Sequence, residues 1–270
     1  MSRGPAIAVA ERPEPLEFAD FAQQLADVAA GIVRRYYRSP VAVETKDDAS
    51  PVTIADREAE RAMRALIQAR HREHGIAGEE FGAERADAEL VWHLDPIDGT
   101  KSFIIGRPLF GTLIGLSHRG RPLLGVIDQC ISGERWLGLL GQGTTCNGAA
   151  IKVRPCPELG RAVLGTTSPS IFATGAQQAG FARVQQAVRY ALFGGDCYSY
   201  GLLAMGLIDL VIEADLDAYD FMALVPVVEG AGGLMTDWQG EPLHAGSAGD
   251  VIAAGDRRLH AAALALLNQG

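Results

Sequence analysis

The chain has 270 residues, 48% of them hydrophobic and 21% charged, and a formal net charge of −9 at pH 7. This length suffices for one large domain or two closely packed subdomains, and the composition excludes a disordered protein. Nucleic acid is excluded as the main partner, because the chain has no basic tract to hold phosphates by counterion release. An anionic substrate stays compatible with the charge, since a bound metal ion reverses the local sign.

The cysteines and the N-terminus indicate a cytoplasmic protein. The four cysteines show no CxxC spacing, and a chain of this size needs no disulfide framework, so we expect reduced thiols. The apolar run Ala6–Ala10 is too short for the core of a signal peptide, and no apolar stretch is long enough to cross a bilayer. We interpret the first dozen residues as a tail.

Apolar residues at helical spacing predict two helices at the start of the chain. The first spans residues 18–36, and the second spans residues 55–74 and is ended by Gly75. A short strand is expected near Val41–Val43, and residues 76–78 form a short extended piece that leads to a pair of glutamates.

The middle of the chain is rich in strands separated by glycine-containing turns. The predicted strands are Leu90–Leu94, Phe110–Ser117, Pro122–Asp128 and Arg135–Leu140. They predict an antiparallel sheet backed by the two opening helices.

After about residue 150 strands and helices alternate. The predicted strands are 163–166, 190–193, 210–213 and 251–254, and the predicted helices are 196–205, 219–228 and 257–267. We therefore expect residues 1–150 to form a subdomain that carries most metal ligands. Residues 151–270 would form an α/β subdomain that completes the active site.

The segment Asp95-Pro96-Ile97-Asp98-Gly99-Thr100 places two carboxylates three residues apart. We expect Pro96 to form a turn and Gly99 to permit the tight backbone that follows, so that both acids point to one side. Carboxylates this close repel each other unless a cation lies between them. A hard divalent ion such as magnesium or manganese suits oxygen ligands.

Further acids fall at strand ends or helix starts, where sheet proteins place binding groups. Glu79 and Asp220 are expected to join Asp95 and Asp98, with Asp56 as a fifth. Each acid also has a structural explanation when taken alone. Asp95 and Asp98 could lie in a solvent turn, and Glu79 could belong to a solvated acidic pair. Asp220 could be a helix N-cap, and Asp56 could be a first-turn acid. The functional interpretation depends on their joint order.

That joint order resembles the inositol monophosphatase-like superfamily of metal-dependent phosphatases. The matching pieces are Pro51-Val52-Thr53-Ile54-Ala55-Asp56, Gly78-Glu79-Glu80, the segment from Asp95 to Thr100, Tyr219-Asp220, and Glu229-Gly230-Ala231-Gly232-Gly233. The resemblance covers nearly the whole chain. It implies a layered α/β/α/β/α fold, a magnesium-dependent phosphomonoesterase and a homodimer. Tyr219 stands where the family commonly has tryptophan.

The resemblance also implies roles for individual residues. The metal ligands would be Glu79, Asp95, Asp98, Asp220 and the backbone carbonyl of Ile97, holding two to three Mg²⁺ ions, with Mn²⁺ as a substitute. Glu79 and Thr100 would orient the attacking water. Asp56 and Lys46 fall where the family has a mobile loop that closes near the metals.

Substrate contacts are predicted at two helix starts, after Gly99 and after Gly195, where backbone N–H groups can receive phosphate oxygens. Thr100 and Asp220 would border the same substrate. Other phosphatase and hydrolase chemistries fit less well, since the acids have DxxD rather than DxD spacing, and neither a P-loop nor a G-x-S-x-G elbow is present.

Three blocks resemble the histidinol-phosphatase branch of the superfamily. They are Thr100-Lys101-Ser102-Phe103, Gly194-Gly195-Asp196-Cys197-Tyr198 and Tyr219-Asp220-Phe221. Histidinol phosphate carries an ammonium group, which Asp196 and Glu213 can pair with. Asp196 could equally be the N-cap of its helix. The alternatives are a phosphatase for inositol or other sugar phosphates, and an inactive relative that only binds a ligand.

Overall fold

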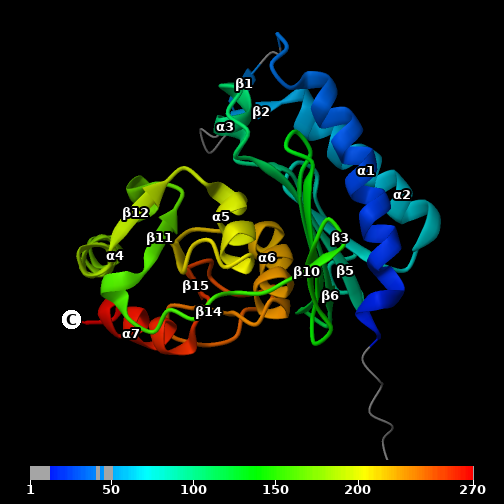
Figure 1. Cartoon of the computed structure of the whole chain (residues 1–270). Helices are drawn as coiled ribbons and strands as arrows, with labels where there is room; N and C mark the ends of the chain where they lie inside the picture. The colour runs from blue at the N-terminus through cyan, green and yellow to red at the C-terminus, as the bar shows by residue number, and fades with distance from the viewer. Residues whose placement is uncertain (1–12, 41–42, 46–50, 270) are drawn as a thin grey trace, which may run out of the picture.

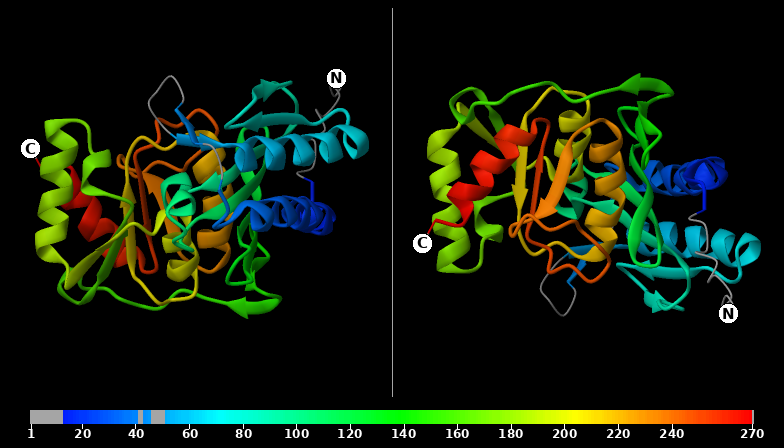
Figure 2. Two further views of the ribbon diagram at one scale, coloured as in Figure 1. Left: turned by 90° about the horizontal axis from the view of Figure 1, so that it is seen from above. Right: turned by 90° about the horizontal axis from the view of Figure 1, so that it is seen from below.

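The computed structural model describes residues 13–40, 43–45 and 51–269, which form five layers. A pair of helices covers an eight-stranded sheet, two further helices lie between this sheet and a five-stranded sheet, and a last pair covers the far face (Figure 1). Figure 2 shows the same order from above and below. Three clusters of buried apolar side chains fill the spaces between the layers. The expected α/β/α/β/α fold is confirmed.

The first layer is the helix pair α1 (Ala19–Tyr36) and α2 (Ile54–Arg70). A 3₁₀ turn, η1 (Pro15–Phe18), precedes α1, and a small hairpin of β1 (Val43–Thr45) and β2 (Pro51–Thr53) joins the helices. The predicted strand start at residues 41–42 and the predicted tail lie outside the described residues.

The prediction that α2 continues to residue 74 is wrong. Its backbone leaves the helix at His71, and Gly75 begins a strand instead of ending the helix. The buried His74 accepts a hydrogen bond from the indole N–H of Trp92 at 3.2 Å, and its ring stacks on that of His71. These aromatic contacts outweigh the helical periodicity of the segment.

The large sheet has the strand order β10-β9-β8-β7-β6-β5-β3-β4. Its strands are β3 (Gly75–Gly78), β4 (Gly82–Glu84), β5 (Leu90–Asp98), β6 (Gly111–His118), β7 (Arg121–Gln129), β8 (Glu134–Leu139), β9 (Gly143–Cys146) and β10 (Ala149–Ile151). The sheet is antiparallel as predicted, except that β3 and β5 run parallel.

A row of glycines lets helix α6 (Ala218–Gly230) lie directly on this sheet. Gly115, Gly125 and Gly138 are register partners on β6, β7 and β8. A Cβ atom at Gly125 would lie 1.9 Å from the carbonyl oxygen of Ala223, and one at Gly138 would lie 2.3 Å from that of Pro226. The contact therefore needs glycine, and it fixes where the first turn of α6 lies.

The small sheet has the order β12-β11-β13-β15-β14. Its strands are β11 (Val163–Thr166), β12 (Tyr190–Phe193), β13 (Leu210–Glu213), β14 (Leu234–Asp237) and β15 (Val251–Ala254). Strands β12, β11 and β13 run parallel, so their carboxyl ends meet at one edge. The chain passes from one sheet to the other between β10 and β11, and the division at residue 150 stays a prediction.

The helices of this half are α4 (Gly175–Ala187), α5 (Asp196–Ala204) and α7 (Arg257–Leu267). In Figure 1, α5 lies beside α6 between the sheets, whereas α4 and α7 lie outside. Within the described ranges, no helix combines the length and apolar character needed to cross a membrane.

His260 in α7 gives a pH-dependent contribution to stability. Its imidazole is buried and shares a 2.9 Å hydrogen bond with the hydroxyl of Thr236, and burial lowers its pKa to about 4. The unfolded chain binds a proton at this histidine near pH 6.5, and the folded protein does not. We expect the free energy of unfolding to fall as pH drops from about 6.5 to about 4, by at most about 1.4 kcal/mol per pH unit from this residue.

His260→Gln keeps a hydrogen-bonding group at this position but cannot titrate, so its stability should depend less on pH across that window. Urea unfolding of both proteins at several pH values measures the difference. Parallel pH profiles of the wild type and the variant would refute the assignment.

Candidate active site

The two acids of the central motif lie at the end of β5. The expected proline turn is wrong, because residues 95–98 stay within the strand and shift its register against β6. The Asp95 carboxylate accepts a 2.9 Å hydrogen bond from the N–H of Ile97, and the Thr112 hydroxyl binds the carbonyl of Pro96 at 2.8 Å. The chain reverses at Gly99, whose φ of 85° is in the left-handed region. The register shift in β5 and the turn at Gly99 thus take the place of the expected turn at Pro96.

Three carboxylates from two distant segments converge here. Asp95, Asp98 and Asp220 each offer one oxygen, and these oxygens lie within 4.8 Å of one another. Asp220 comes from the first turn of α6, where its carboxylate accepts the N–H of Asp217 at 2.8 Å. Asp217 is the N-cap of α6, so Asp220 is not. The capping hydrogen bond orients Asp220 toward β5.

The electrostatics of this cluster favour a bound cation. Burial raises the pKa of Asp95 well above its usual range, and the charges of Glu79, Asp98 and Asp220 raise it further. Burial, with Asp196 nearby, raises the pKa of Asp98 to about 8. Ionised carboxylates at these positions are unfavourable when no cation is bound. A divalent ion that neutralises the carboxylates makes their ionised form favourable. The oxygen-only donors fit magnesium.

Glu79 and Asp56 border the same cluster. The N–H of Glu79 donates to the carbonyl of Leu94 at 3.1 Å, which places Glu79 beside β5. Asp56 is in the first turn of α2, as expected, and forms a capping box with Thr53. Its other oxygen is buried without a hydrogen-bond partner among the described residues, and burial raises the pKa of Asp56 to about 6. Lys46 lies outside the described residues.

A buried ion pair holds the loop that carries Glu79. Glu60, one turn after Asp56 on α2, binds Arg64 at 2.7 Å and accepts the N–H of Glu80 at 2.7 Å. A Cβ atom at Gly78 would lie 2.1 Å from the Glu60 carboxylate, which explains the glycine before the glutamate pair. We did not predict Glu60, although its i+4 spacing from Asp56 puts both on one helix face.

The residues after Gly99 form a short helix, α3 (Thr100–Ile104), so the predicted helix start after Gly99 is confirmed. The hydroxyl of Thr100 donates to the carbonyl of Ile97 at 3.1 Å. This bond leaves the hydroxyl oxygen as an acceptor beside the acids. Gly99 itself lies against α5, since a Cβ atom there would be 3.0 Å from the Asp196 carboxylate.

Asp196 does not cap its helix, so that alternative is wrong. Gly195 is the N-cap of α5, and Asp196 has a φ of 43°, a strained conformation for this residue. This backbone turns the carboxylate toward α3, where it accepts a 3.3 Å hydrogen bond from the Ser102 hydroxyl. Burial raises the pKa of Asp196, whereas the nearby charges of Arg107 and Lys101 lower it.

Two expected contacts are already used within the protein. The N–H of Cys197 at the start of α5 donates to the Asp98 carboxylate at 2.6 Å, so this N–H is not available to phosphate. Glu213, at the end of β13, is buried and accepts the N–H of Thr167 at 2.7 Å and the hydroxyl of Tyr200 at 3.3 Å. Burial raises the pKa of Glu213 to about 7. These hydrogen bonds hold the Glu213 carboxylate at the end of β13, and its contact with a substrate stays a prediction.

Comparisons with known proteins identify the family of the chain. The profile of the inositol monophosphatase family matches residues 14–270. The bifunctional phosphatase IMPL2 of Arabidopsis thaliana, described as chloroplastic, is 50% identical over 256 residues, 92% of this chain and 74% of that protein. A histidinol-phosphatase of Mycobacterium tuberculosis is 34% identical over 252 residues, 91% of this chain and 96% of that protein.

Solved structures show the same relationship. An inositol monophosphatase from Zymomonas mobilis is 50% identical, with a TM-score of 0.88 over 96% of this chain and 100% of that one. An inositol monophosphatase from Anabaena is 27% identical, with a TM-score of 0.80 over 93% of this chain and 95% of that one. The chain belongs to the inositol monophosphatase family of phosphatases.

Proposed function

We propose that this protein is a magnesium-dependent phosphomonoesterase that hydrolyses L-histidinol phosphate to L-histidinol and phosphate, a step of histidine biosynthesis. The observation that carries the reaction class is the convergence of Asp95, Asp98 and Asp220 within 4.8 Å. Phosphate ester hydrolysis needs charge neutralisation and a positioned water more than it needs covalent chemistry. Cations bound to this acidic cluster would supply the first of these.

The chain's own residues divide the work in this proposal. Asp95, Asp98, Asp220, Glu79 and the Ile97 carbonyl would hold the magnesium. The metal would supply positive charge for the phosphate and would lower the pKa of the attacking water. Glu79 accepts a proton from the attacking water. Thr100 accepts the second hydrogen bond of that water, because its own proton is engaged by Ile97. Asp56 lies next to Glu79, and its carboxylate adds negative charge that a bound cation would balance.

Two features support histidinol phosphate as the substrate. Several relatives are named histidinol-phosphatase, one of them 33% identical over 220 residues. Asp196 holds a carboxylate over the central motif in a strained backbone, and a carboxylate there suits an ammonium group better than a neutral polyol. Lys101 and Arg107 partly offset this charge. Inositol and other sugar phosphates remain the second candidate, since the Zymomonas relative is named an inositol monophosphatase.

Asp196→Asn tests the substrate assignment, because it removes the charge and keeps the shape of the side chain. We expect kcat/KM for L-histidinol phosphate to fall at least tenfold, or about 1.4 kcal/mol, with inositol 1-phosphate changed less than threefold. Phosphate release from both esters measures this, and the second ester serves as the internal control. Faster turnover of inositol 1-phosphate than of histidinol phosphate by the wild type would refute the assignment.

We further propose a homodimer of two-subdomain chains in the cytoplasm. The edge strand β12 exposes three large apolar side chains, Tyr190, Leu192 and Phe193, which suits a contact with a second copy. The four cysteines are free thiols, as a reducing compartment requires. Light scattering of the purified protein tests the dimer, and a monomeric mass would refute it.

A further inference from the structure

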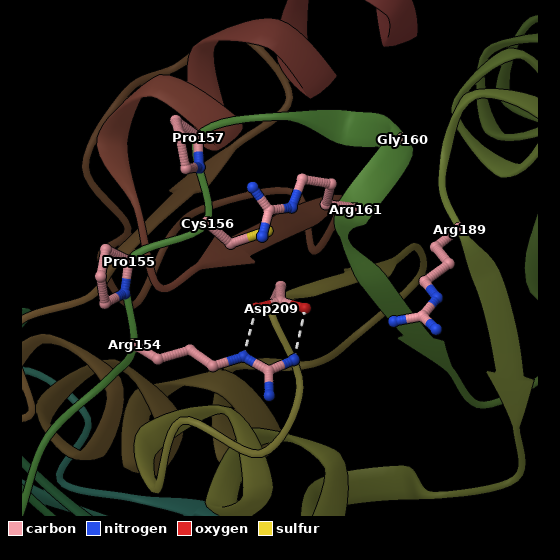
Figure 3. Close-up of a pocket in the computed structure, with 8 residues that line it drawn as sticks. All are labelled: Arg154, Pro155, Cys156, Pro157, Gly160, Arg161, Arg189 and Asp209. Carbon is pink, nitrogen blue, oxygen red and sulfur yellow. Dashed lines mark hydrogen bonds and ion pairs between the residues drawn. The ribbon is translucent and has the colours of Figure 1, made fainter.

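A second pocket, away from the acidic cluster, is lined by three arginines (Figure 3). It has a volume of about 470 Å³ and is bordered by Arg154, Cys156, Arg161, Arg189 and Asp209, with two prolines and a glycine on its rim. This volume is within the range of small-molecule sites. The pocket combines segments that lie up to 55 residues apart in the chain, as Arg154 and Asp209 do.

The pocket lies at the opposite edge of the small sheet from the candidate active site. Arg161, Arg189 and Asp209 come just before β11, β12 and β13, at the amino ends of these parallel strands. Asp196 and Glu213 follow or end β12 and β13 at their carboxyl ends. A ligand in this pocket therefore does not touch the acidic cluster.

One of the three arginines is fully paired. Arg154 binds Asp209 through two parallel hydrogen bonds, both 2.7 Å long, and Asp209 also accepts the N–H of Val163 at 2.8 Å. Asp209 is buried, so this pair forms a rigid floor with its charges balanced. It contributes shape to the pocket and no net charge.

The other two arginines are not compensated. Within the described part of the chain, no carboxylate forms an ion pair with Arg161 or Arg189. The backbone N–H of Arg189 donates to the backbone carbonyl of Ala162 at 3.0 Å, which places the backbone of Arg189 beside the residue that follows Arg161. In Figure 3 both side chains project into the pocket, that of Arg161 toward Cys156. Two guanidinium groups without a carboxylate partner among the described residues thus share one pocket in a protein whose net charge is −9. That of Arg189 also lies over the ring of Tyr190, 5.8 Å from the ring centre.

We propose that this pocket binds a small dianion whose oxygens reach both Arg161 and Arg189. Guanidinium forks match the oxygens of phosphate and carboxylate groups with paired hydrogen bonds, and a dianion balances both charges. Pro155 and Pro157 restrict the backbone of the rim, so little ordering is needed on binding. The ligand is a phosphorylated compound or a dicarboxylate, which share this chemistry.

The test measures binding of inorganic phosphate and of succinate by calorimetry in the presence of a chelator. Without divalent ions the acidic cluster repels anions, so the arginine pocket is isolated as the binding site. We expect one saturable site in the wild type. Arg161→Gln combined with Arg189→Gln should weaken binding at least tenfold. The stronger of the two probes identifies the ligand as phosphoryl or dicarboxylate.

A matched control removes the same charge elsewhere. Arg72→Gln combined with Arg121→Gln neutralises two exposed arginines outside the pocket and should change the affinity less than twofold. Equal weakening by both double variants would show only general electrostatic attraction and would overturn the proposal. So would the lack of saturable binding of either probe by the wild type up to about 10 mM. These results do not depend on phosphatase activity, so this proposal and the proposed function can fail separately.

Discussion

Asp98→Asn is expected to lower magnesium-dependent phosphate release at least about a thousandfold. The carboxylate of Asp98 lies within 4.8 Å of those of Asp95 and Asp220, and it also accepts the N–H of Cys197 at 2.6 Å. Asparagine keeps nearly the same shape and can still accept this hydrogen bond, but it removes one negative charge. The loss of activity would therefore report on metal binding and not on misfolding.

The same variant should not be less stable than the wild type when metal is absent. The pKa of Asp98 is raised to about 8, so the folded protein holds a proton that the unfolded chain releases above pH 3.9. Stability from this group therefore falls as pH rises from about 4 to about 8, and asparagine avoids that loss. Magnesium should raise the melting temperature of the wild type more than that of the variant.

Asp20→Asn is the matched control for these experiments, because Asp20 is exposed in α1. It should change neither turnover nor the response to magnesium. Retention of more than a tenth of the activity by Asp98→Asn would contradict the assignment of the acidic cluster as the metal site.

Gly125→Ala is expected to destabilise the protein by at least about 3 kcal/mol. The new methyl group would lie 1.9 Å from the carbonyl oxygen of Ala223 and 3.1 Å from its Cα atom. Both contacts are with the backbone of α6, so no side-chain rotation can relieve them. Helix α6 must move away from the sheet, and Asp220 in its first turn must move with it. Turnover should fall about a hundredfold in the molecules that stay folded.

Gly31→Ala provides the comparison. Gly31 lies within α1, and an added Cβ atom there meets no atom within 4 Å. Alanine at this position should be neutral or stabilise the protein by up to about 1 kcal/mol. Urea unfolding of both variants measures the difference. Equal stability of Gly125→Ala and the wild type would show that α6 does not need the glycine row.

The sequence predicted elements well where the apolar pattern was clear. Strands β11 and β13 and helix α7 agree with their predicted ranges residue for residue. Helix α4 was missed, because it buries only Gly180, Phe181 and Val184 and so has little apolar periodicity. The start of helix α3 after Gly99 was predicted, but its five residues are too few to show a helical period that would give its length.

The acidic cluster was predictable from the order of the acids along the chain, and the structure brings Asp95, Asp98 and Asp220 together. The surroundings of Asp196 were not predictable. Its position depends on a positive φ and on the approach of α5 to Gly99, which are tertiary features without a local signal. The hydrogen bond from Ser102 and the charge of Arg107, which both affect Asp196, were not predictable for the same reason. These residues precede Asp196 by 94 and 89 positions, and only the tertiary fold brings them close.

The central claim is that the acidic cluster holds magnesium for the hydrolysis of a phosphate monoester. Phosphate release from L-histidinol phosphate by the purified wild-type protein tests it most directly, first with a chelator and then with magnesium restored. We predict no release above background with the chelator and full recovery with magnesium. Release that the chelator does not affect, or the lack of release from any phosphate ester with magnesium present, would contradict the account.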